Sequence, residues 1–141
     1  ANLDDYRMNI KELIPQREPI IMVDDILAHE EKQIKSCFLI NSDNIFVENG
    51  CLTESGLLEN IAQTAASKVG LEAKNRNEKI PLGFIGAITK VVVHAFPSVG
   101  DTILTEVVIL QEVFNITLIA AKVFSENTLL VECQMKIALE S

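Results

Sequence analysis

The stretch from residue 53 to residue 70 constrains the fold most, because its pattern predicts one long helix that is buried on most sides. Its apolar side chains recur at helical spacing and form one broad stripe: Leu57, Leu58, Ile61, Ala62, Ala65, Ala66 and Val69. The opposite side carries small or amide side chains rather than strong charges: Asn60, Gln63, Thr64 and Ser67. Thr53 belongs to a residue type that caps helix N-termini, and Gly70 predicts the C-terminal end.

Glu59 is the exception on this helix, because it places a carboxylate within the apolar face. A carboxylate in such surroundings must be ion-paired, hydrogen-bonded or functional. Gln63 lies one turn further along on the same side. Glu59 is therefore either a structural carboxylate held by hydrogen bonds or an acid–base group at a pocket.

The rest of the chain has the pattern of strands joined by short loops. A short helix at residues 10–14 comes first, and Pro15 and Pro19 end it. Predicted strands cover residues 20–28, 33–40, 82–94, 103–113, 116–124 and 129–139. Polar or turn-forming segments separate these elements at residues 29–32, 41–50, 72–79, 95–100 and 125–128.

Two strands, one helix and four strands with short returns predict an antiparallel sheet. The helix has about 17 residues and is about 25 Å long, which matches a sheet that curls around it. We therefore expect the α+β class, with a curved antiparallel sheet wrapped around one long central helix. The length of 141 residues suits a single domain over residues 1–141.

Composition excludes several function classes. The net charge of −8 argues against nucleic-acid binding, because phosphate contacts need clustered Lys and Arg. No apolar stretch approaches the ~20 residues that cross a bilayer, and no leader pattern begins the chain, so we expect a cytoplasmic protein without membrane contact. Three separated cysteines and two histidines suit neither a disulfide framework nor a metal site. We expect the cysteines to be small buried residues and no metal to be bound.

Three segments resemble a known enzyme family, in that family's order. Residues 13–24 read Leu-Ile-Pro-Gln-Arg-Glu-Pro-Ile-Ile-Met-Val-Asp and resemble the Leu-Pro-His-Arg-x-Pro-x-x-x-Val-Asp opening of the beta-hydroxyacyl-ACP dehydratases. Residues 58–63, Leu-Glu-Asn-Ile-Ala-Gln, resemble that family's Glu-Ala-Met-Ala-Gln helix. Residues 84–86, with Lys90 and residues 99–101, resemble its Phe-Val-Gly…Lys…Pro-Gly-Asp run.

This resemblance implies a hot-dog fold and a dimer, or a higher homo-oligomer, with acyl tunnels at the subunit boundary. It implies a substrate held as a thioester on the phosphopantetheine of an acyl carrier protein, in fatty acid or polyene-type lipid biosynthesis, with no cofactor. It makes Glu59 the candidate catalytic residue. It also makes Phe84 and Gly86 candidate substrate-binding residues.

The chain departs from the family where the chemistry needs a histidine. The family's Gly-His-Phe-Pro segment before the helix corresponds to residues 49–53, which read Asn-Gly-Cys-Leu-Thr, and its other histidine corresponds to Gln16. Beta-elimination needs a base for the alpha proton and an acid for the hydroxyl, and Glu59 can supply only one. Cys51 falls where the histidine would lie, but thiols are mostly protonated at neutral pH. His29, in a predicted polar turn, and His94 could replace the missing histidine only from the other subunit, across a dimer interface.

The remaining candidate residues each have two interpretations. Gln63 either supports Glu59 or contacts substrate, and Gln16 is expected to form hydrogen bonds at the pocket mouth. The backbone N–H groups of Ser55 and Gly56, in the first helical turn, either bind the thioester carbonyl or only cap the helix. A basic group near the end of the helix is either a solvated connector or a docking site for an acidic carrier protein: Lys68, Lys74, Arg76 and Lys79.

Three functions therefore remain open: an unusual dehydratase, a non-catalytic acyl-thioester-binding subunit beside a histidine-bearing dehydratase partner, and a hot-dog thioesterase. The absent histidine leaves open whether the protein is an enzyme at all. A positioned general base contributes about 10²–10⁴-fold in rate. We therefore expect the isolated protein to be a poor dehydratase that still binds, or acts on, a carrier-linked acyl chain.

Overall fold

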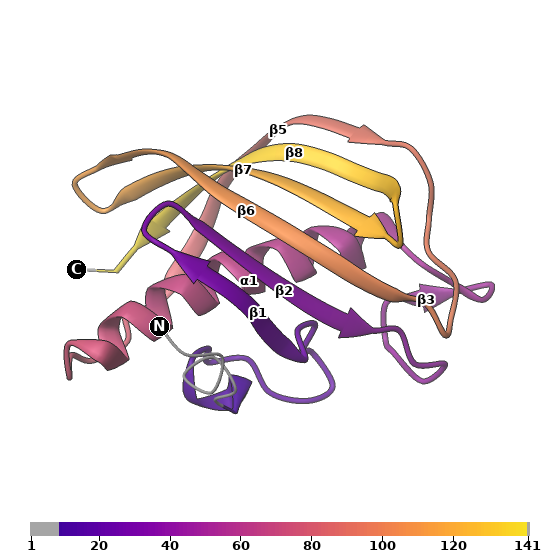
Figure 1. Ribbon diagram of the computed structural model, residues 1–141, viewed down its shortest axis with the longest axis horizontal. Helices are drawn as coiled ribbons and strands as arrows, with labels where there is room; N and C mark the ends of the chain where they lie inside the picture. The colour runs from indigo at the N-terminus through magenta and orange to yellow at the C-terminus, as the bar shows by residue number, and fades with distance from the viewer. Residues whose placement is uncertain (1–8, 141) are drawn as a thin grey trace.

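The computed structural model describes residues 9–140, and within them a curved antiparallel sheet surrounds one long helix (Figure 1). The helix, α1, spans Glu54–Asn75. The sheet order is β1-β2-β6-β7-β8-β5. Its strands are β1 (Asp25–Glu30), β2 (Gln33–Leu39), β5 (Gly83–Val93), β6 (Thr102–Val113), β7 (Ile116–Ser125) and β8 (Thr128–Leu139). This confirms the predicted α+β hot-dog architecture.

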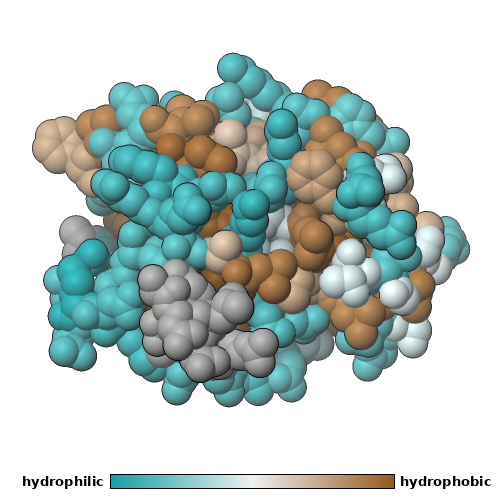
Figure 2. Space-filling model, in the orientation of Figure 1, coloured by the Kyte–Doolittle hydropathy of each residue, from teal (hydrophilic) through white to brown (hydrophobic). Residues whose placement is uncertain are grey.

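The core lies between the concave face of the sheet and α1. Leu57 and Ile61 of the helix are fully buried, as are Val107, Ile119 and Met135 on the central strands. Each such side chain contributes about 1.5–3 kcal/mol when it leaves water. On β8, the side chains of Val131, Cys133, Met135 and Ile137 point into this core. Figure 2 shows hydrophobic patches between hydrophilic residues on the surface. The exposed apolar residues of the described chain include Leu104, Val108 and Leu110 of β6.

The start of α1 was predicted correctly and its end was not. Thr53 is the N-cap, and its Oγ1 accepts a hydrogen bond from the backbone N–H of Gly56 at 3.4 Å. The helix continues past Gly70 to Asn75. A Cβ at Gly70 would lie 2.0 Å from the backbone oxygen of Leu13, so glycine is required there by close packing rather than as a stop signal.

The amide and hydroxyl side of α1 is fully buried, as the sequence predicts. Asn60 donates to the backbone oxygen of Met22 at 2.7 Å and accepts a hydrogen bond from Thr105. The hydroxyls of Thr64 and Ser36 lie 2.7 Å apart. These bonds satisfy the polar groups and tie α1 to β2, to β6 and to the segment before β1.

The prediction of a strand from residue 20 was wrong, because β1 begins only at Asp25. Met22 and Val23 are fully buried, which explains the apolar pattern. Their backbone is held by a side chain instead of a neighbouring strand: Gln63 Oε1 accepts from the N–H of Met22 at 2.6 Å, and Gln63 Nε2 donates to the oxygen of Ile20 at 2.9 Å.

Three smaller differences concern regions predicted from local signals. The first helix is a 3-10 turn, η2 (Ile10–Glu12). The loop before α1 contains a small hairpin, β3 (Val47–Glu48) with β4 (Cys51–Leu52). His29 lies in β1 rather than in a turn. None of the helices described in residues 9–140 combines the length and the hydropathy needed to cross a bilayer.

Candidate functional site

A cavity of about 270 Å³ lies between one side of α1, the segment before β1 and the start of β5. Ala62, Ala66 and Val69 form its helical wall, and Phe84 and Ile85 lie opposite. Apart from Glu59 and Gln16, every described residue that lines it is apolar, proline or glycine. The cavity therefore suits an apolar chain with one polar region at Glu59 and Gln16.

Glu59 is half-buried at this cavity and is held by Gln63. Gln63 Nε2 donates to Glu59 Oε1 at 3.1 Å. Gln63 itself is fully buried, does not line the cavity and also bonds to the backbone of Ile20 and Met22. The structure thus makes Gln63 a residue that positions Glu59 and leaves the carboxylate of Glu59 facing the cavity.

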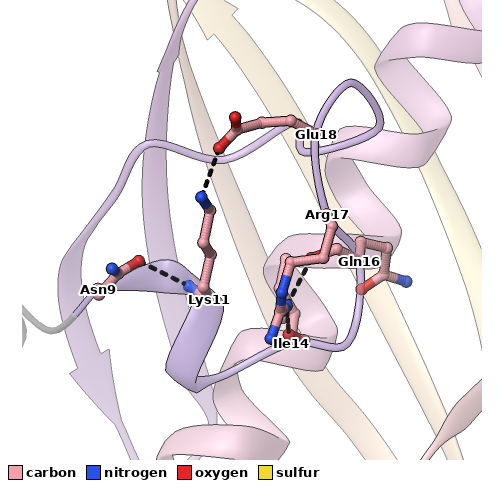
Figure 3. Close-up of polar contacts among 6 residues, drawn as sticks. All are labelled: Asn9, Lys11, Ile14, Gln16, Arg17 and Glu18. Atoms are coloured by element: carbon pink, nitrogen blue, oxygen red, sulfur yellow. Dashed lines mark hydrogen bonds and ion pairs between the residues drawn. The ribbon is translucent and has the colours of Figure 1, made fainter.

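Gln16 has the opposite character, because its side-chain oxygen is buried and has no hydrogen-bond partner among the described residues. The loop around it is held firmly: Arg17 Nη1 donates to the backbone oxygens of Ile14 and Gln16 at 2.8 Å each, and Lys11 pairs with Glu18 at 2.7 Å (Figure 3). The side chain of Gln16 points away from that of Arg17 (Figure 3). A buried acceptor without a donor costs about 1–3 kcal/mol, so a donor from a ligand would stabilise it.

Three predicted site residues lie outside this cavity, near the start of α1. Cys51 is half-buried in β4, and its backbone forms an isolated antiparallel β-bridge with Ser98. Ser55 is exposed. Gly56 is buried, and a Cβ there would lie 2.7 Å from the side chains of Leu52 and Phe46. Close packing therefore accounts for Gly56, and a substrate role for these three residues stays a prediction.

Of the two predicted site residues on β5, only one lines the cavity. Phe84 lines the cavity and is 59% exposed. Gly86 is exposed at a bulge between Ile85 and Ala87, and it does not line the cavity. Both lie on the last strand of the sheet order, which has a neighbour on one side only.

Neither histidine lines the cavity. His94 is exposed, with its Nε2 3.1 Å from Glu132 Oε2. His29 is not the solvated turn residue that we predicted, because only 15% of its side chain is exposed and it lies against Lys68 and Glu72. Burial and the nearby Lys68 ammonium lower the pKa of His29. The described part of the chain therefore supplies no imidazole to Glu59.

The three cysteines differ in burial, and the four basic residues differ in whether they form an ion pair. Burial raises the pKa of Cys133 to about 11, which confirms an unreactive core thiol there, while Cys37 and Cys51 are only half-buried. Three of the four basic residues lie close to a carboxylate: Lys68 to Glu72, Lys74 to Glu12 and Arg76 to Glu78. This pairing leaves less positive charge for docking a carrier than the sequence alone indicates.

The chain matches the model of the ApeP-like family, described as ApeP dehydratase, over residues 8–139. It belongs to the ApeP-like dehydratase family. The resemblance to the dehydratases that the motifs indicate is thereby confirmed, as a divergent hot-dog member. No curated protein matches the sequence significantly.

Solved structures share the hot-dog fold with this ApeP-like chain. The dehydratase heterocomplex ApeI:P from Xenorhabdus doucetiae matches with a TM-score of 0.89 at 15% identity, covering 95% of this chain and 92% of that one. A sigma28-regulated virulence protein from Campylobacter jejuni matches with a TM-score of 0.76 at 14% identity, covering 100% of this chain and 94% of that one. A hypothetical thioesterase with coenzyme A from Streptococcus pneumoniae matches with a TM-score of 0.67 at 6% identity, covering 82% of this chain and 87% of that one.

Proposed function

We propose that this protein binds carrier-linked acyl thioesters in the Glu59 cavity and forms the carboxylate half of a 3-hydroxyacyl dehydratase site. The observation that carries the proposal is that Glu59 and Gln16 line an otherwise apolar cavity, and that the amide oxygen of Gln16 has no donor among the described residues. In the elimination, a base removes the alpha proton, the carbon–oxygen bond at C3 breaks, and an acid protonates the departing hydroxyl as water. Glu59 would be that acid, and Gln16 would accept the hydrogen bond of the 3-hydroxyl.

The missing base then comes from another subunit. β5 lies at the end of the sheet and exposes apolar side chains, among them Phe84, Ile85, Val91 and Val92. Exposed strand edges are hazards that proteins cover. A subunit paired along β5 would cover these side chains and the cavity mouth that Phe84 and Ile85 line. The partner would be a second copy of this chain or, as the ApeI:P heterocomplex suggests, a different dehydratase subunit. In the second case, we expect that subunit to carry the histidine.

The test is a comparison of binding and turnover in the purified protein alone. Binding of 3-hydroxyacyl pantetheine analogues should be measurable by calorimetry, because each buried methylene contributes ~0.8 kcal/mol without any histidine. Conversion to the enoyl product should stay well below the ~10 s⁻¹ of typical enzymes. Absence of any acyl-thioester binding would remove the proposal. Efficient dehydration by the protein alone would remove the need for a partner.

A thioesterase is the second candidate, supported by the carboxylate beside a glutamine and by the fold shared with the hypothetical thioesterase. Against it, the amide of Gln63 is already occupied by Met22, Ile20 and Glu59. Release of free thiol from acyl pantetheine would favour hydrolysis over the dehydratase assignment. Formation of the enoyl thioester, once a histidine-bearing partner is added, would favour dehydration.

A further inference from the structure

The outer face of the sheet carries a row of alternating charges across four neighbouring strands, here called the charge row. Lys35 of β2 is in register with Glu106 of β6. Glu106 is in register with Lys122 of β7, and Lys122 is in register with Glu132 of β8. All four side chains reach solvent, whereas the residues next to them along each strand are buried. Because α1 packs on the concave face, the charge row lies on the face opposite the helix (Figure 1).

The charge row is only partly paired within the chain. Lys35 Nζ lies 3.4 Å from Glu106 Oε1, and His94 Nε2 lies 3.1 Å from Glu132 Oε2. Lys122 lies between two carboxylates of the row, yet within residues 9–140 no ion pair joins its ammonium to a carboxylate. A hollow of about 280 Å³ lies beside Lys122. The outer face therefore leaves room for a charged group of another molecule at the middle of the row.

The alternation of sign determines how a second copy of the chain can pack on this face. Two copies stacked face to face are related by a two-fold axis in the plane between them. If the axis runs along the strands, it reverses the order of the row. Lys35 then faces Glu132 of the partner subunit, and Glu106 faces Lys122 of the partner subunit. If the axis runs across the strands, each charge faces its own counterpart, and like charges repel.

The rows on both sides of the charge row match under the same reversal. Their members are symmetric in kind about the middle of the four strands: Leu104 with Phe124, Val108 with Ala120, and, further out, Gln33 with Gln134. Reversal therefore places apolar on apolar side chains in both rows, and amide on amide at the ends of one. Cross-strand charge pairs can stabilise a single sheet, but that role does not require the neighbouring rows to be symmetric.

We propose that the outer face of the sheet binds a second copy of this chain, back to back, with the two-fold axis along the strands so that the charge rows pair. Sheets that pack face to face keep their strands within about 30° of each other, which suits this axis. Six strands about 4.8 Å apart and about ten residues long present a planar area of roughly 800 Å². This is the area that each partner buries in a standard interface. The contact leaves the edge of β5 free, so it is independent of the proposed function.

The experiment measures the mass of the assembly by analytical ultracentrifugation at micromolar concentration. Lys122→Glu brings two carboxylates together at two symmetric contacts, and Glu106→Lys brings two ammonium groups together there. Each variant alone should have half the mass of the unmodified protein, whether or not subunits also pair along β5. The dissociation constant should rise about 100-fold, because each like-charged contact weakens binding at least about tenfold. Lys79→Glu, with the same change in net charge on the exposed connector after α1, should keep the full mass.

Mixing the two variants separates lost complementarity from lost folding. In an equimolar mixture, each substituted charge faces an opposite charge on the other variant, so the mixture should regain the full mass. If one single variant does not fold, the double variant Lys122→Glu with Glu106→Lys replaces the mixture, because it restores opposite charges at both contacts and should associate with itself. A mixture or a folded double variant that stays at half the mass would overturn the inference. So would a single variant that keeps the full mass.

Discussion

Two sides of helix α1 carry polar side chains, and they differ in how those side chains are satisfied. On one side, Asn60 and Thr64 are fully buried and each forms hydrogen bonds to other elements. On the cavity side, Glu59 is half-buried with one hydrogen-bond partner, and the side-chain oxygen of Gln16, another residue that lines the cavity, has none among the described residues.

The difference separates structural polar groups from functional ones. A buried polar group that is fully bonded stabilises one packing arrangement, and its removal is expected to reduce stability. A buried acceptor that lacks a donor weakens the folded state until a ligand supplies one. Substitutions on the bonded side should therefore alter unfolding, and substitutions on the cavity side should alter binding and turnover.

The largest effect is expected for Glu59→Gln, which keeps the shape and removes the ionisable group. Turnover by the complex with a histidine-bearing partner should fall about 10²–10⁴-fold. The free energy of unfolding should change by less than about 0.5 kcal/mol, because a glutamine oxygen can still accept from Gln63. Turnover is measured by enoyl formation, with the exposed Glu54→Gln as the matched control. Full activity of Glu59→Gln would refute the assignment of Glu59.

The next effect concerns stability. Asn60→Ala leaves the buried hydroxyl of Thr105 and the backbone oxygen of Met22 without their partner. The free energy of unfolding should fall by about 2–4 kcal/mol in urea titrations. Butanoyl-pantetheine affinity, measured where the variant remains folded, should be unaltered. A loss below about 1 kcal/mol would show that this side of α1 is not the structural one.

A smaller effect is expected for Gln16→Met, which should reduce substrate affinity without reducing stability. The change removes the orphaned oxygen and fills the same volume, so the free energy of unfolding should stay equal or rise by up to about 1 kcal/mol. Affinity for 3-hydroxyacyl analogues should fall about fivefold, while affinity for acyl analogues without the hydroxyl should not change. Equal affinity loss for both kinds of analogue would mean that Gln16 shapes the cavity but does not bind the hydroxyl.

The smallest effect is a pH dependence at the other end of α1. The pKa of His29 is lowered by burial and by Lys68, so below about pH 6.5 the unfolded chain binds a proton more readily than the folded one. The neutral His29 therefore contributes to the free energy of unfolding above about pH 6.5. This contribution is lost as the pH falls from the pKa of the unfolded chain to the lower pKa of the folded chain. Urea titrations between about pH 8 and pH 5 should show this slope, and His29→Gln should reduce it. The control is His94→Gln, which alters an exposed histidine.

Local patterns were enough for much of the fold. The repeating apolar stripe and Thr53 correctly predicted the start and the buried sides of α1. Strand-like segments and the turn residues between them predicted the strands that follow the helix, since both signals depend on neighbours in the chain. Glu59 could be identified as a candidate because a carboxylate on an apolar helix face is costly without a role.

Where prediction failed, a distant residue outweighed the local signal. Gly70 is a usual stop signal, yet the backbone of Leu13 crosses there and requires the absence of a Cβ. Residues 20–23 have a strand pattern, yet Gln63 takes the place of a strand partner. His29 stands among charged residues in the sequence, yet β1 directs it against α1.

The sequence by itself therefore determined the helix, the antiparallel strands and the candidate carboxylate, because periodicity, capping and burial cost are properties of short segments. Only the tertiary structure decided that Gln16 and Glu59 line one cavity and that Lys68 is buried beside a second. Those placements depend on which surfaces meet after folding. The hydrogen-bond partners that such a contact supplies or withholds are set by residues far apart in the chain.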